Sequence, residues 1–294
     1  MKRSFTFLIC LPLLLLLQLH AYAQPGTTAA EKTLLWKISS KEMKQPSYLF
    51  GTIHLICHDD YVWTPAMKRS LDACKEVCFE MDLDEPSLMM EVATGMMDKN
   101  GKTLKEYFSE ADYAKLEKYV HDSLGMDLEV FQPMKPIALL TLFSTKGASC
   151  DTPESYEANI MQEAQKANKN ITGLESVSEQ LDLFDNLPVD SVIKDIMEAV
   201  NGIEEDPRSF EALVKAYKKQ DLPALHKLIQ ESGKRDIDLS GFLDMRNEKW
   251  VPRMIEKMDN NAVFFAVGAG HLPGEMGIIS LLRKAGYTVT PIKK

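Results

Sequence analysis

An uninterrupted apolar run near the end of the chain, Ala262–Val267 (AVFFAV), restricts the possible folds more than any other feature. A strand without polar positions is covered on both faces, which is typical of the centre of a parallel sheet with helices on either side. Shorter strand patterns accompany this run at residues 34–39, 47–53, 76–82, 170–174 and 288–292. The sequence therefore predicts an α/β fold with a central mixed sheet flanked by helices.

Helical spacing dominates the stretch between the strand at 76–82 and the apolar run, for example over residues 104–124 and 241–258. Pro252 predicts an interruption or a kink in the second of these helices. The sequence contains no segment rich in Gly, Ser or Pro that would mark a linker. We therefore predict one domain over residues 33–294, with a large helical insertion between its sheet-forming ends.

The N-terminus has the three parts of a secretory signal peptide. Two basic residues precede an apolar run over residues 5–19, and Ala21-Tyr22-Ala23 supplies the small residues of a cleavage site. The run is shorter than the roughly 20 residues of a membrane-spanning helix, so we expect no transmembrane anchor. These features predict a signal peptide at 1–23, a disordered leader remnant at 24–32 and an exported protein, periplasmic or secreted.

The charge of the chain disfavours one class of partner. Lys and Arg number 34 against 43 Asp and Glu, which gives a formal net charge of −9. Because an acidic protein repels phosphate backbones, we expect no nucleic-acid partner. The sequence leaves the oligomeric state open.

Four cysteines remain after removal of the leader, namely Cys57, Cys74, Cys78 and Cys150. They allow three pairings, and the sequence does not decide between them. Cys57 and Cys150 both lie in polar, loop-like surroundings, which favours a disulfide between these two. Cys74 and Cys78 lie at a predicted helix-to-strand junction, where small buried side chains are expected rather than zinc ligands.

Two strands end in the same motif, a glycine followed three residues later by a histidine. The first is Gly51-Thr52-Ile53-His54, and the second is Gly268-Ala269-Gly270-His271. Glycine lets another group approach the backbone closely, and the histidine follows the carboxyl end of the strand, where open α/β sheets bind ligands. A single motif of this kind is uninformative, but two copies after apolar strands predict a site containing both His54 and His271.

Four more polar residues are candidates for the same site. Glu80 interrupts an apolar strand, which indicates either a buried carboxylate with a partner or a solvent-facing position on an edge strand. Arg246 and Asn247 are ordinary residues for a helix surface when taken alone. Glu175 ends another short strand, where it is either a site residue or a charge at a helix N-terminus.

These motifs together resemble the TraB/GumN family, which has Tiki-type and PrgY-type members with two Gly-x-x-His motifs. The resemblance covers nearly the whole mature chain in the right order, at residues 49–55, 79–82, 173–175, 246–247 and 271–274. It implies a fold similar to erythromycin esterase and ChaN proteins, and a site built from His54, Glu80, Arg246, Asn247 and His271. It further implies metal-dependent proteolysis with manganese or cobalt.

The residue types suit this chemistry. Imidazoles and a carboxylate suit a borderline divalent metal, which makes His54, Glu80 and His271 the candidate ligands. Arg246 would stabilise a developing oxyanion, and Asn247 would orient the substrate or hydrogen-bond a ligand. Without a metal, His54 or Glu80 would act as a general base instead.

We therefore expect an exported metal-dependent hydrolase, most simply a peptidase with a peptide or protein substrate. The alternative is a non-catalytic protein that binds haem, a metal or a peptide in the same cleft.

Overall fold

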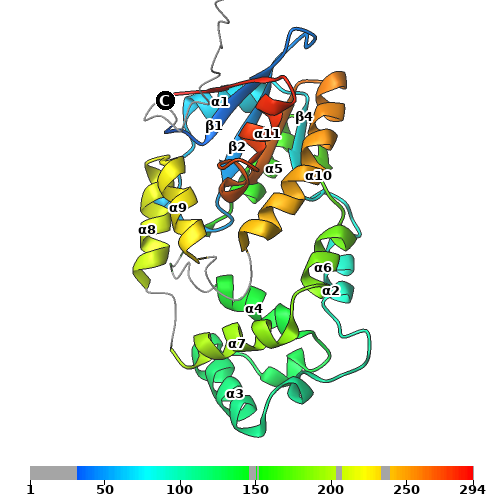
Figure 1. The fold of residues 1–294 in the computed structure, drawn as a ribbon, viewed down its shortest axis with the longest axis vertical. Coiled ribbons are helices and arrows are strands. Elements are labelled where there is room, and N and C mark those ends of the chain that lie inside the picture. Colours follow the sequence, from blue (N-terminus) through cyan, green and yellow to red (C-terminus); the bar gives the residue numbers. More distant parts are fainter. Residues whose placement is uncertain (1–31, 146–149, 151, 203–206, 233–238, 294) are drawn as a thin grey trace, which may run out of the picture.

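The computed structural model describes residues 32–145, 150, 152–202, 207–232 and 239–293 (Figure 1). The predicted signal peptide and all but the last residue of the predicted leader remnant lie outside this range. That last residue, Lys32, donates a hydrogen bond to Asp221 at 2.6 Å. No helix in the described part of the chain is long and apolar enough to cross a membrane.

Six strands form one mixed sheet. In chain order they are β1 Leu35–Ser39, β2 Ser47–Thr52, β4 Glu76–Phe79, β6 Asn170–Gly173, β7 Val263–Gly268 and β8 Thr288–Pro291. Across the sheet their order is β6-β4-β7-β2-β1-β8. The first four strands in this order are parallel, and β1 is antiparallel to both β2 and β8. The α/β class and the mixed sheet predicted from the sequence are confirmed.

The apolar run lies where its composition predicts. β7 pairs with β4 on one side and β2 on the other, and Val263–Val267 are buried on both faces of the sheet. Every side chain of this run is therefore removed from water, which makes β7 a large contributor to the hydrophobic core.

Eleven helices of the α type lie within the described residues. They are α1 Pro65–Asp72, α2 Leu88–Gly95, α3 Glu110–Leu124, α4 Pro136–Thr145, α5 Tyr156–Lys166, α6 Val177–Asp185, α7 Val189–Val200, α8 Pro207–Lys218, α9 Leu222–Ser232, α10 Leu239–Asn260 and α11 Ile278–Lys284. α10 continues through Pro252, so the predicted interruption is wrong, whereas the alternative of a kink stays a prediction. The single helix predicted over 104–124 is also wrong: Ser109 accepts a hydrogen bond from the Asp112 amide and begins α3 after a short 3-10 turn.

The direction of the strand connections decides which helices cover each face of the sheet. Two connections lead across the sheet toward its β6 edge, namely β2–α1–β4 and β4–α5–β6. Two others lead toward the β8 edge, namely β6–α10–β7 and β7–α11–β8. Because crossovers between parallel strands are right-handed, these two pairs of helices cover opposite faces. Figure 1 shows α10 and α11 in front of the sheet and α1 and α5 behind it.

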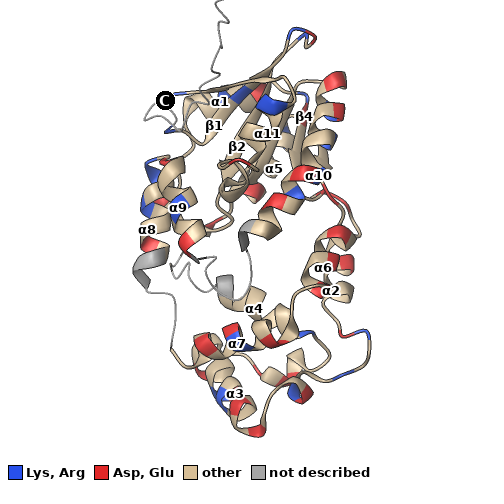
Figure 2. Cartoon of the chain, in the orientation of Figure 1, with Lys and Arg blue, Asp and Glu red and all other residues tan. Residues whose placement is uncertain are grey.

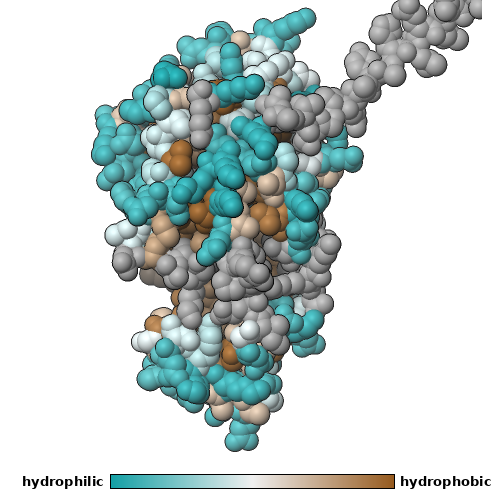
Figure 3. All heavy atoms as spheres, turned by 90° about the vertical axis from the view of Figure 1, so that its left-hand side faces the viewer, coloured by the Kyte–Doolittle hydropathy of each residue, from teal (hydrophilic) through white to brown (hydrophobic). Residues whose placement is uncertain are grey.

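Part of the helical insertion has a hydrophobic core of its own. Leu104, Leu116, Val120, Leu139 and Ile196 belong to a buried cluster separate from the core around the sheet. We call the segments that form it, residues 104–143 and 189–200, the helical lobe; it lies in the lower part of Figure 1. The surface seen in Figure 3 is largely hydrophilic, with small groups of hydrophobic residues near its middle.

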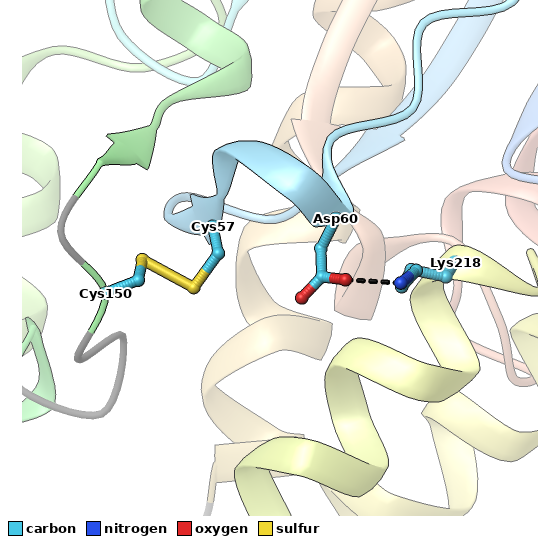
Figure 4. The surroundings of a disulfide bond; sticks show 4 residues. All are labelled: Cys57, Asp60, Cys150 and Lys218. Carbon is cyan, nitrogen blue, oxygen red and sulfur yellow. Dashed lines mark hydrogen bonds and ion pairs between the residues drawn. A yellow bond between two sulfur atoms is a disulfide. The ribbon is translucent and has the colours of Figure 1, made fainter.

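A disulfide joins Cys57 to Cys150, as the polar surroundings of these residues predict (Figure 4). It stands beside a two-stranded sheet formed by β3 (Ile56–Cys57) and β5 (Pro153–Glu154). The same figure shows Asp60 paired with Lys218 of α8. Cys74 and Cys78 are buried and free, and burial raises the pKa of each thiol to about 12, so both are unreactive side chains of the core.

Removal of the disulfide by Cys57→Ser with Cys150→Ser is expected to lower the free energy of unfolding by about 2–4 kcal/mol. The bond joins residues 93 positions apart, and so it restricts the unfolded chain strongly. Denaturant unfolding with and without a reducing agent measures the effect, and the double variant should not respond to the reductant. An unfolding midpoint of the original protein that ignores the reductant would contradict the prediction.

Candidate active site

The candidate residues meet at the carboxyl edge of the sheet, next to its central strand. The chain leaves β4 and β7 toward opposite faces of the sheet, and ligands of open α/β sheets bind where neighbouring connections diverge in this way. Glu80 follows β4 directly, and His271 ends the short 3-10 turn after β7. The topology therefore brings a carboxylate and an imidazole to one point although roughly 200 residues, including the helical insertion, separate them in the sequence.

Arg246 of α10 is the centre of this group. Its Nη2 donates to Glu80 Oε2 and to Glu175 Oε1, both at 2.6 Å, and its Nε donates to Glu175 at 3.1 Å. The guanidinium lies 4.4 Å from the ring centre of Trp250, and the Trp250 indole N–H also donates to Glu175 at 2.9 Å. Arg246 and Glu175 are buried, so each charge is compensated by partners rather than by water.

His271 is held by Asn247, the neighbour of Arg246 in α10. The Asn247 amide nitrogen donates to the His271 and Met276 carbonyls, at 3.3 and 2.9 Å, which leaves Oδ1 to accept from His271 Nδ1 at 2.7 Å. This assignment places the ring proton on Nδ1, and Nε2 then accepts from Arg246 Nη1 at 3.2 Å. Burial lowers the pKa of His271 to about 4, so the ring is a neutral imidazole at neutral pH.

Glu80 is the carboxylate that lies beside this imidazole. Its Oε1 accepts from the Gly268 amide at 2.8 Å and lies 3.8 Å from His271 Nε2. Burial by itself would raise the pKa of Glu80, but His271, Arg246, His54 and the Gly268 amide outweigh it and lower the pKa to about 2. Of the two interpretations open from the sequence, the buried carboxylate with a partner is therefore correct.

His54 follows β2, the strand on the other side of β7, and has different partners. Its Nδ1 lies 3.2 Å from Glu157 Oε1, and this hydrogen bond raises the pKa of His54 above its ordinary value. The side chain is 75% exposed, in contrast to the buried His271. β2 pairs with β7 up to Thr52 and Gly268, so the two motifs leave the sheet from neighbouring positions. The structure thus brings together Glu80, Arg246, Asn247 and His271, with His54 beside them at the next strand end.

Sequence reasoning missed or undervalued three residues of this region. Glu175 is more than a charge at a helix N-terminus, since it pairs with Arg246. Trp250 contacts both Arg246 and His271, with 4.3 Å between the Trp250 and His271 ring centres, but an apolar residue in a helix carries no signal of this role. Glu157 is an acidic residue in the first turn of a helix, which the sequence makes unremarkable.

The glycines of the two motifs permit close approaches around this edge. A Cβ atom on Gly51 would lie 3.0 Å from Leu272 and 3.1 Å from Ala269, so the first motif packs against the turn of the second. A Cβ atom on Gly268 would lie 3.2 Å from Glu80 Oε1, beside the amide that binds this carboxylate. Gly51 thus serves the turn of the other motif, whereas a Cβ atom on Gly268 would approach both Glu80 and, at 3.6 Å, its own His271.

The donor set fits a divalent cation in its chemistry and charge. Glu80 Oε1 and the lone pair of His271 Nε2 are 3.8 Å apart and are donor types that manganese and cobalt accept. The two carboxylates of the group, Glu80 and Glu175, outnumber its one guanidinium, that of Arg246. The structure does not bring a third ligand to these two: among the residues described, no three His, Cys, Asp or Glu side chains converge on one point.

Arg246→Met is expected to lower the free energy of unfolding by about 3–5 kcal/mol, because it leaves Glu80 and Glu175 as buried charges without their cation. Arg253 provides the matched control two turns later in the same helix. It pairs with Glu179, and both side chains are about one-third exposed, so Arg253→Met should cost about 1 kcal/mol. Denaturant unfolding of both variants measures the difference, and equal losses would argue against a buried charge cluster.

Comparison with known proteins identifies relatives of this chain. Similar curated proteins include "Metalloprotease TIKI2" of Danio rerio, 20% identical over 321 residues, covering 90% of this chain and 62% of the relative. "Metalloprotease TIKI1" of Homo sapiens is 23% identical over 331 residues, covering 90% and 64%. "Metalloprotease TIKI homolog" of Amphimedon queenslandica is 22% identical over 348 residues, covering 95% and 67%. The chain spans about three fifths of the length of the first relatives it matches.

No solved structure matches the chain, so the similarity to erythromycin esterase and ChaN proteins stays a prediction. The family model described as "TraB/PrgY/gumN family" matches residues 34–291, which include all six strands and every candidate site residue. The family resemblance that the two Gly-x-x-His motifs indicate is therefore confirmed, and the chain belongs to the TraB/PrgY/gumN family.

Proposed function

We propose that this protein is an exported metal-dependent hydrolase, a peptidase that acts on a peptide or protein substrate. The observation that carries the proposal is the group of Glu80, Arg246 and His271, in which an ionised carboxylate lies beside a neutral imidazole and a guanidinium. Such groups accept protons and stabilise negative charge, as hydrolysis of an amide requires. The relatives named metalloproteases support the same reaction class.

His54, Glu80 and His271 are the residues that would hold the cation. A divalent cation bound there would lower the pKa of a water molecule and polarise a carbonyl oxygen. The formal net charge of −9 favours a cation over a phosphate-bearing substrate, and acidic residues follow one another along α6, for example Glu179, Asp182 and Asp185 (Figure 2). His54 is the exposed member of the set, and its contact with Glu157 engages Nδ1, which leaves Nε2 for a ligand.

The remaining residues have roles that their contacts support. Asn247 fixes the tautomer of His271 and so keeps Nε2 unprotonated, where it now accepts from Arg246. This contact favours the interpretation of Asn247 as the hydrogen-bond partner of a ligand. Arg246 holds Glu80 in its ionised form and supplies positive charge where an oxyanion would develop. The Glu80 carboxylate and the Nε2 atom of His271 carry no proton at neutral pH, so either can accept one from an attacking water.

Export is part of the proposal for two reasons. The predicted signal peptide addresses the chain to an oxidising compartment, and a disulfide such as Cys57–Cys150 persists in such compartments. Manganese and cobalt are the metals that the family resemblance implies, and the activity assay below therefore uses both.

Incubation of the purified protein with a peptide library, with and without added Mn²⁺ or Co²⁺, is expected to yield cleavage products that mass spectrometry detects. His271→Ala and His54→Ala should each lower kcat/KM by roughly 10²–10⁴-fold, the usual worth of a catalytic proton-transfer group. His121→Ala is the control, since this exposed histidine lies on α3 in the helical lobe, and it should retain full activity.

Full activity in both site variants would exclude the proposed site. Retention of a peptide, a metal or haem without any turnover would instead support the non-catalytic alternative. Haem binding has its own signature, a Soret band that grows on titration.

A further inference from the structure

One carboxylate outside the central group contacts the exposed histidine of the first motif. Glu157, the second residue of α5, is largely buried, with 17% of its side chain exposed. Its Oε1 accepts from Thr52 Oγ1 at 2.6 Å and lies 3.2 Å from His54 Nδ1. Its Oε2 accepts from Ser155 Oγ at 3.2 Å. Two donors besides His54 therefore hold the carboxylate, and its position does not depend on the histidine.

The backbone around both residues is fixed as well. His54 lies between β2 and β3, and Glu157 follows β5 by three positions. β3 and β5 pair with each other, and the Cys57–Cys150 disulfide joins the same two segments (Figure 4). A histidine and a carboxylate that are about 100 positions apart in the sequence are thus held in register by a ladder and a covalent bond.

We propose that Glu157 is a positioning residue, which fixes the ring orientation and the proton of His54. As the acceptor at Nδ1 it retains a proton on that nitrogen, and Nε2 is then the atom left for a substrate or a cation. A carboxylate that accepts from the second nitrogen of a functional histidine sets its tautomer and raises its basicity as a ligand. The consequence for catalysis rests on the proposed function, whereas the effect on the His54 ring does not.

The chain offers a matched control in the neighbouring pair. His58 Nδ1 lies 2.8 Å from Glu154 Oε1, and the two pairs join the same two segments of the chain. This pair lies outside the site, and its histidine is 65% exposed. Glu154→Gln therefore removes a comparable histidine–carboxylate hydrogen bond without touching His54.

The test uses the full chain with ¹⁵N-labelled histidine and no added metal. Long-range ¹H–¹⁵N spectra, recorded at a pH where the His54 ring is neutral, show which ring nitrogen carries the proton, and a His54→Gln variant assigns the signals. The original protein should show nearly all of the Nδ1–H form. Glu157→Gln should shift His54 toward the mixture of tautomers typical of a solvated ring, and Glu154→Gln should leave His54 unchanged.

An unchanged His54 tautomer in Glu157→Gln overturns the proposal. If Glu157→Gln fails to fold, Glu157→Asp replaces it, because this variant keeps the charge but shortens the side chain by one methylene. Loss of the Nδ1–H preference of His54 in Glu157→Asp supports the positioning role, and retention of that preference overturns the proposal. On an active protein, Glu157→Gln should also lower kcat/KM or Co²⁺ affinity by roughly 10–100-fold. A tautomer shift in a protein that cleaves no peptide leaves the positioning role intact and rejects only the proposed function.

Discussion

The site depends on one buried guanidinium. Arg246 contacts the groups that follow three neighbouring strands, namely Glu175 after β6, Glu80 after β4 and His271 after β7. Leaving any of these carboxylates alone in the core would cost several kcal/mol, so the pairing fixes α10 against the carboxyl edge of the sheet. Asn247, the next residue of the same helix, then orients His271. Two consecutive helix residues thus determine the geometry of groups drawn from distant parts of the sequence.

Much of the fold follows from local patterns. The apolar run at 262–267 predicts a central strand, and the strand patterns at 34–39 and 47–53 predict β1 and β2. The glycines of the motifs indicate close contacts at strand ends, which the approach of Leu272 to Gly51 bears out. In each case the signal lies within a few residues, because burial, backbone freedom and side-chain periodicity are local properties of the chain.

Partnerships between distant residues could not be predicted in the same way. Glu175 and Glu157 look like ordinary acidic residues near helix starts, and only the folded chain shows that one pairs with Arg246 and the other with His54. The two motif histidines share a sequence pattern but have opposite surroundings, because one lies under α10 and the other at the surface. Strand order is likewise a long-range property: β7, late in the sequence, inserts between two early strands.

The position of β7 between two early strands affects the order in which the site can form. β2 and β4 are made early, but they do not pair with each other, because both pair with β7, which the final third of the polypeptide supplies. A growing chain therefore holds the first imidazole and the strand carboxylate without the second imidazole or the guanidinium. The group around Arg246 forms only when the last-made strand of the parallel set is present, so an incomplete chain has no assembled site.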